Sequence, residues 1–157
     1  MLSEEAIKKI DCELTKYPDD KRQAAVMSAL RIVQTERGWL SPESISEVAQ
    51  YLRIPDIAAL EVATFYNMYD TEPVGKYKIT VCTNISCMLR DSDEIVDHLQ
   101  ERLGIGFNEV TEDGKYCLKE GECMGACGGA PLLSVNNSKM HEFLTPEKVD
   151  VILKGLK

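Results

Sequence analysis

Apolar residues in the first half of the chain recur at intervals of three and four, which places them on one side of a helix. This pattern predicts four helices, separated by proline or glycine, at 3–17, 21–37, 41–52 and 55–66. Gly38 is a natural end for the second helix, and Ser41 followed by Pro42 is a typical start for the third. We therefore expect an all-helical first half that holds its aromatic cluster in the core: Phe65, Tyr66 and Tyr69.

After residue 72 the pattern changes to the alternation of apolar and polar residues that is typical of strands. The alternation predicts two separate strands, at 77–82 and 115–119. A hairpin is expected further along, with Asn136 and Asn137 in its turn and strands at 132–135 and 139–144. The residues that follow position 82 are expected to form a loop.

Two helices are expected in this second half. One covers about 91–103, with a capping box from Asp91 to Glu94 at its start, and the other follows Thr145 and Pro146. The order strand, helix, strand, hairpin, helix indicates a small sheet covered by helices, which is the thioredoxin-like arrangement. The sequence thus predicts an α/β protein with an N-terminal helical bundle over 1–72, followed by a thioredoxin-like domain over 73–157.

Two pairs of cysteines follow the two predicted strands. Cys82 and Cys87 are separated by four residues, and Cys123 and Cys127 by three. This spacing lets two thiolates on each of two loops converge on one centre, so the four are candidate ligands of one metal site. Both a [2Fe–2S] cluster and a structural zinc ion take four thiolates. The small residues around Gly125 allow backbone amides to approach the sulfurs, which favours the cluster and leaves zinc as the alternative.

The remaining cysteines and the two histidines have simpler interpretations. Cys12 and Cys117 are expected to be buried for packing, because free cysteine is among the most buried residue types. A disulfide framework is disfavoured, since such frameworks belong to small secreted domains that lack a core. Neither His98 nor His141 stands in a Cys-x-His pair, so both are expected to be solvated rather than ligands of a Rieske-type centre.

Charge and motifs exclude several classes of function. The net charge is −8 and no cluster of lysine or arginine is present, which argues against nucleic acids and anionic membrane surfaces as partners. No apolar run reaches the length of a membrane span, and the acidic start is unlike a signal peptide, so a cytoplasmic location is expected. Glycine-rich nucleotide motifs and nucleophile–base pairs are also missing, so no complete active site is expected in this chain alone.

Several segments together resemble the 24 kDa [2Fe–2S] subunit of respiratory complex I, and the resemblance covers nearly the whole chain. They are 61–66, 73–76, 81–82, 87–90, 103–105 and 122–127. The resemblance implies a thioredoxin-like ferredoxin domain with one [2Fe–2S] cluster on four cysteines, which correspond to Cys82, Cys87, Cys123 and Cys127. Cys117 stands where this family commonly has threonine, and Gly121 where it commonly has an aliphatic residue.

The resemblance also implies partners. One is a flavoprotein subunit that holds FMN, oxidises NADH and exchanges single electrons with the cluster; others are further iron–sulfur subunits of NADH:quinone oxidoreductase. The chain would lie peripherally at the inner membrane through this complex, docked by residues 1–72. Two alternatives are a diaphorase component of an NAD-linked formate dehydrogenase or hydrogenase, and a free-standing thioredoxin-like ferredoxin.

Overall fold

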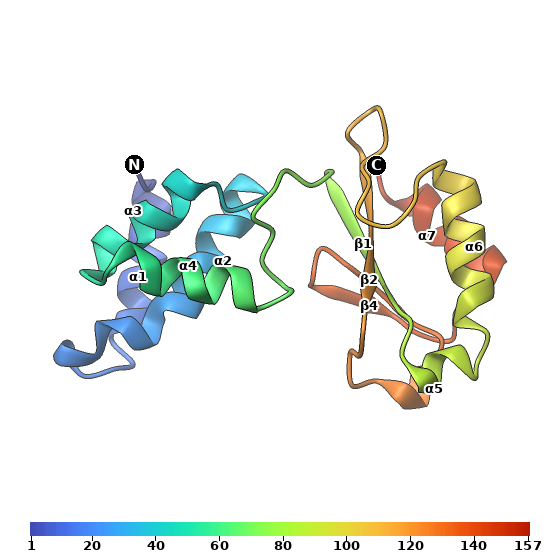
Figure 1. Cartoon of the computed structure of the whole chain (residues 1–157), viewed down its shortest axis with the longest axis horizontal. Helices are drawn as coiled ribbons and strands as arrows, with labels where there is room; N and C mark the ends of the chain where they lie inside the picture. Colours follow the sequence, from blue (N-terminus) through green and yellow to red (C-terminus); the bar gives the residue numbers. More distant parts are fainter. The chain divides into compact units, whose positions relative to one another are not determined.

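The computed structural model describes every residue from Met1 to Lys157. The chain divides into two compact units, which we call the helical unit (Met1–Pro73) and the sheet unit (Val74–Lys157) (Figure 1). Each unit has its own apolar core. The predicted fold class is therefore confirmed: helices come first, and a sheet with helices follows.

The helical unit contains four α-helices and one 3-10 helix. They are α1 (Glu4–Leu14), η1 (Asp19–Ala25), α2 (Val26–Arg37), α3 (Pro42–Leu52) and α4 (Asp56–Phe65). The side chain of Ser3 accepts a hydrogen bond from the Ala6 amide at the start of α1, and Ser41 accepts one from Ser44 at the start of α3. The apolar faces of the helices meet in one core, which includes Ile10, Leu30, Leu40, Val48 and Leu52.

Three expectations for this unit were wrong. The helix predicted from residue 21 begins as η1, in which Lys21 has non-helical angles, and the α-helix starts only at Val26. Cys12 is exposed, because it lies off the side of α1 that carries the buried Ile10. Of the aromatic cluster only Tyr69 is buried, whereas Phe65 is 79% exposed at the end of α4.

The sheet unit has four strands in the order β2-β1-β3-β4. They are β1 (Tyr77–Cys82), β2 (Tyr116–Gly121), β3 (Leu133–Val135) and β4 (Lys139–His141). β1 pairs with β2 in parallel, and the other two pairings are antiparallel. Helices α6 (Ser92–Leu103) and α7 (Pro146–Gly155) lie on one side of the sheet in Figure 1. The predicted order of strand, helix, strand, hairpin and helix is confirmed.

Two local expectations for this unit were also wrong. The expected loop after Cys82 contains a short helix, α5 (Ile85–Met88). The capping box is not formed, because the chain enters α6 from a tight turn in which the Asp91 amide donates to the Met88 carbonyl. Asp91 consequently has a φ of 66°, and its side chain makes no capping hydrogen bond. The peptide bond between Ala130 and Pro131, just before β3, is cis.

Polar side chains join α6 to α7. Arg102 donates two hydrogen bonds to the carboxylate of Asp150, and His98 Nε2 lies 3.0 Å from Asp150 Oδ1. Arg102 first, and His98 second, hold the pKa of Asp150 below its usual value. His98 is therefore not the solvated side chain that the sequence suggested, but a partner in the contact between two helices.

Two valines on α7 test which side of that helix supports the sheet. Val149 is completely buried and Val151 is 67% exposed. We expect Val149→Ala to lower the free energy of unfolding by about 2 to 3 kcal/mol, because two buried methyl groups are lost and a cavity remains. Val151→Ala should change it by no more than a few tenths of a kcal/mol, roughly the gain in helix propensity. Chemical denaturation of both variants measures the difference, and equal losses would contradict the packing described here.

Candidate metal centre

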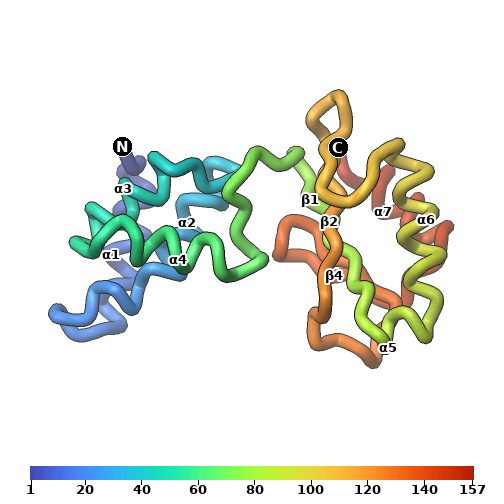
Figure 2. The backbone as a smooth tube through the Cα atoms, in the orientation of Figure 1, coloured from blue at the N-terminus to red at the C-terminus, as the bar shows by residue number.

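The parallel pairing of β1 and β2 brings the two cysteine-bearing loops to the same edge of the sheet. In this register Cys82 lies opposite Gly121, and the amide of Thr83 donates to the Gly121 carbonyl over 3.0 Å. Parallel strands end at the same edge, so the segments 83–87 and 122–127 leave the sheet side by side. Figure 2 shows the two segments close together near α5.

Cys82 and Cys87 are buried next to each other at this edge. Their exposed fractions are 2% and 1%, and they form a small apolar cluster with Ala130 and Leu132. The thiol of Cys82 donates to the Glu122 carbonyl over 3.6 Å, so it already contacts the loop that carries the second cysteine pair. Helix α5 positions Cys87, whose amide donates to the Asn84 carbonyl over 2.8 Å.

The environment of Cys87 disfavours its thiolate in the metal-free protein. Burial, and then the hydrogen bond with Cys82, raise the pKa of Cys87 to about 11, while a hydrogen bond from the Leu132 amide acts in the opposite direction. The thiol is therefore protonated at neutral pH. A metal ligand must be deprotonated, so binding at this position releases a proton, and the positive charge of the metal stabilises the thiolate.

Cys123 and Cys127 lie at the same edge but are exposed. Cys127 begins the short 3-10 helix η2 (Cys127–Gly129), and its charge contributes to the raised pKa of Cys87. The structure holds no group of three or more Cys, His, Asp or Glu side chains arranged to bind a metal ion. It thus brings two of the four predicted ligands into contact and both pairs to one edge, without gathering all four thiols. Their joint role as ligands stays a prediction.

The backbone group that favours a cysteine thiolate is not one of those that the glycines suggested. The Gly129 amide donates to the Ala126 carbonyl over 2.9 Å. The Leu132 backbone, by contrast, acts to lower the pKa of Cys87, against the larger effect of burial. Leu132 comes from the segment before β3, close in sequence to Cys127 but far from Cys87 itself. The spacing of the cysteines does not predict this effect on Cys87, which depends on β3 lying beside β1.

Gly121 lies at a position with little room for a side chain. A Cβ atom on Gly121 would lie 2.8 Å from Thr80 Cγ2 and 2.9 Å from Met124 Cε. The side chain of Met124 therefore occupies the space that an aliphatic residue at position 121 would need. Cys117, the other departure, is buried within β2 as expected.

The chemistry of the donor set fits an iron–sulfur cluster. Four cysteines, the ligands that Fe–S clusters use, stand on two loops that leave adjacent strands. The surroundings of the two buried sulfurs are apolar, with Met124 and Ala126 packed against them. The hydroxyl of Thr83, the residue after Cys82, donates to Glu120 over 2.7 Å.

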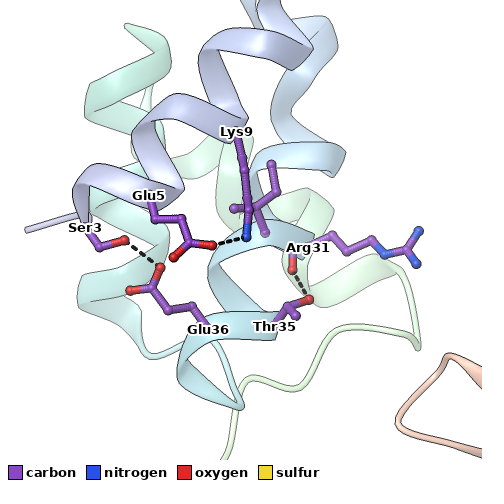
Figure 3. A pocket seen from close by; sticks show the side chains of 7 residues that line it. Ser3, Glu5, Lys9, Arg31, Thr35 and Glu36 are labelled. Carbon is purple, nitrogen blue, oxygen red and sulfur yellow. Dashed lines mark hydrogen bonds and ion pairs between the residues drawn. The ribbon is translucent and has the colours of Figure 1, made fainter.

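A separate pocket of about 580 Å³ lies in the helical unit between α1 and α2 (Figure 3). Its charged and polar groups largely bind one another. Lys9 Nζ lies 2.6 Å from Glu5 Oε1, and the hydroxyl of Ser3 donates to Glu36 Oε2 over 2.6 Å. The pocket contains no cysteine, so it is not a second candidate for the metal centre.

A family profile and several proteins of known sequence match this chain. The profile of the family described as thioredoxin-like [2Fe–2S] ferredoxin matches residues 10–157. NADH-quinone oxidoreductase subunit 2 of Thermus thermophilus is 42% identical over 142 residues, which cover 90% of this chain and 78% of that protein. A subunit of the NADH-quinone oxidoreductase of Rickettsia bellii is 43% identical over 145 residues, which cover 92% of this chain and 86% of that protein.

A solved structure supports the fold. A chain of an NAD+-reducing [NiFe]-hydrogenase in the air-oxidized state superposes with a TM-score of 0.72 and 19% sequence identity, over 89% of this chain. The matched part is 24% of that hydrogenase chain, so this similarity concerns the fold alone. The sequence matches show more than the fold, and they confirm the family that the sequence motifs suggested. The chain belongs to the thioredoxin-like [2Fe–2S] ferredoxin family and, within it, to the group formed by these NADH-quinone oxidoreductase subunits.

Proposed function

We propose that this chain is an electron-transfer subunit in which Cys82, Cys87, Cys123 and Cys127 hold one [2Fe–2S] cluster. When bound, such a cluster takes up and releases one electron at a time. The chain exchanges these electrons with the FMN of a partner subunit that oxidises NADH, within an NADH-quinone oxidoreductase that contains further iron–sulfur subunits.

The observation that carries this proposal is the meeting of both cysteine-bearing loops at one edge of the sheet, with the thiols of Cys82 and Cys87 buried in contact. Burial of these two sulfurs excludes water from one side of the site. The Leu132 backbone acts to lower the pKa of Cys87, so it favours negative charge on this sulfur. These residues thus exclude water from the sulfurs and favour negative charge on them, which a one-electron site requires from the protein.

An NADH-quinone oxidoreductase has more support than a hydrogenase or formate dehydrogenase as the surrounding complex. The Rickettsia bellii protein is 43% identical to this chain, whereas the hydrogenase chain is 19% identical. The helical unit gives a reason to prefer either complex over a free-standing ferredoxin, because it adds a separate core that the cysteine site does not require.

We further propose that the helical unit docks this chain to its partners in the complex. Helix α4 supports this role, since its outer side exposes large apolar side chains: Ile57 is 59%, Leu60 41% and Phe65 79% exposed. Exposed apolar patches commonly mark contacts between proteins.

No helix of the chain is both long enough and apolar enough to cross a membrane. We propose a cytoplasmic, peripheral position in which other subunits hold this chain at the membrane.

Electron exchange with purified components tests this function. The isolated chain carrying its cluster should not oxidise NADH, because a pair of electrons as hydride needs a flavin to divide it. When the cluster has first been reduced with dithionite, an oxidised flavoprotein subunit of NADH-quinone oxidoreductase should accept one electron per chain through its FMN, and the visible absorption of the oxidised cluster should return. Steady NADH oxidation by the flavin-free chain would contradict the proposed division of labour. Failure of the flavoprotein to reoxidise the cluster would contradict the proposed partner.

A further inference from the structure

Glu120 and Thr83 join the two strands that carry the cysteine loops. The hydroxyl of Thr83 donates to Glu120 Oε1 over 2.7 Å. Thr83 directly follows Cys82, and Glu120 stands three residues before Cys123. The hydrogen bond therefore connects the two strand ends from which both loops leave the sheet.

Two other contacts join the same strand ends, and they respond differently to metal binding. The backbone bond from the Thr83 amide to the Gly121 carbonyl, 3.0 Å long, does not depend on any side chain. The contact from the Cys82 thiol to the Glu122 carbonyl needs the proton of that thiol, which is lost when cysteine becomes a metal ligand. The hydrogen bond between Thr83 and Glu120 involves no cysteine, so it can still hold the loop after β1 against β2 when the thiols become ligands.

We propose that Glu120 is a positioning residue for the cluster site and that its charge lowers the reduction potential there. Through Thr83 it holds the end of β1 next to Cys82. Its carboxylate also places a negative charge beside the ligand loops, and such a charge opposes the addition of an electron. This inference rests on the proposed function, because it requires that the four cysteines hold a redox centre.

Two substitutions separate the roles of charge and hydrogen bond in the full chain carrying its cluster. Glu120→Gln keeps an oxygen that accepts from Thr83 but removes the charge. We expect the equilibrium constant for one-electron reduction to rise by about two- to tenfold, a shift of the midpoint potential of about 20 to 60 mV in a titration followed by EPR. The shift should shrink as salt is added, because an exposed charge is screened.

Thr83→Val keeps the charge and removes the donor. This variant should lose its visible absorption to an iron chelator several-fold faster than the wild type, and Thr83→Ser, which restores a hydroxyl, should recover the slower rate. A rate for Thr83→Val equal to that of the wild type would overturn the positioning role.

Glu112 provides a matched control for the charge. It is exposed and precedes the start of β2 at Tyr116, so it lies at the opposite end of that strand from the cysteine loops. Glu112→Gln removes the same charge and should leave the midpoint unchanged, because screening is strong over that distance. Equal midpoints for Glu120→Gln and the wild type, or equal shifts in both glutamine variants, would overturn the role of the Glu120 charge. A wild-type chain without a [2Fe–2S] spectrum would instead contradict the proposed function.

Discussion

Replacing Cys127 with alanine abolishes the visible absorption of the cluster, if the four cysteines are its ligands. A [2Fe–2S] cluster takes four ligands from the protein, and alanine has no atom that can replace the sulfur. Cys127 is an informative choice because it is exposed, so its loss leaves no cavity in a core. An absorption spectrum of the purified variant, with circular dichroism to show that the chain is folded, measures the effect.

Cys12 provides the matched control, since it is also exposed and lies in the helical unit. Cys12→Ala should keep the full spectrum. Cys117→Ser should also keep the colour but lose some stability, because it places a hydroxyl at a buried position. A brown, folded Cys127→Ala variant would show that another group completes the site.

The second large effect concerns the reduction potential, which we expect to be low. Four thiolates around an oxidised [2Fe–2S] core give a net charge of about −2, and the added electron brings it to about −3. The protein itself carries a net charge of −8, which further opposes reduction. We therefore expect a midpoint nearer the roughly −400 mV of plant-type ferredoxins than the range of about −150 to +300 mV of Rieske centres.

The positions of the histidines support this expectation. His98 lies on α6 and contacts Asp150, and no histidine joins a metal-binding group in the structure. The Leu132 amide offsets part of the cost of reduction, but one neutral hydrogen bond does not have the effect of replacing two thiolates by imidazoles. A redox titration followed by EPR measures the midpoint. A value above about −150 mV would mean that the all-cysteine ligation or the charge argument is wrong.

Sequence patterns predicted those parts of the fold in which local spacing decides the structure. The strand that ends at Cys82 and the helix that begins at Pro42 were found because alternation and a capping serine mark them directly. Helix α5 was missed, since four residues are too short to show a helical period. Cys12 was assigned to the core from its residue type, although the buried Ile10 shows that the core side of α1 lies elsewhere.

The candidate site was likewise predictable from the sequence only in part. Cysteine spacing identified four candidate ligands, because pairs of thiols on short loops are visible in any sequence. The effect of the Leu132 backbone on the pKa of Cys87 and the hydrogen bond from Thr83 to Glu120 could not be predicted, because both depend on which strands lie side by side. The register of β1 with β2 and β3 determines these contacts, and no local pattern encodes that register.

The most direct test of the central claim is an analysis of iron, acid-labile sulfide and zinc in the purified full-length chain, combined with EPR after reduction. We predict two iron atoms and two sulfide ions per chain, a brown protein, and the EPR signal of a reduced [2Fe–2S] cluster. A colourless protein that contains zinc and no sulfide would contradict the account, because four thiolates would then form a structural site without redox chemistry.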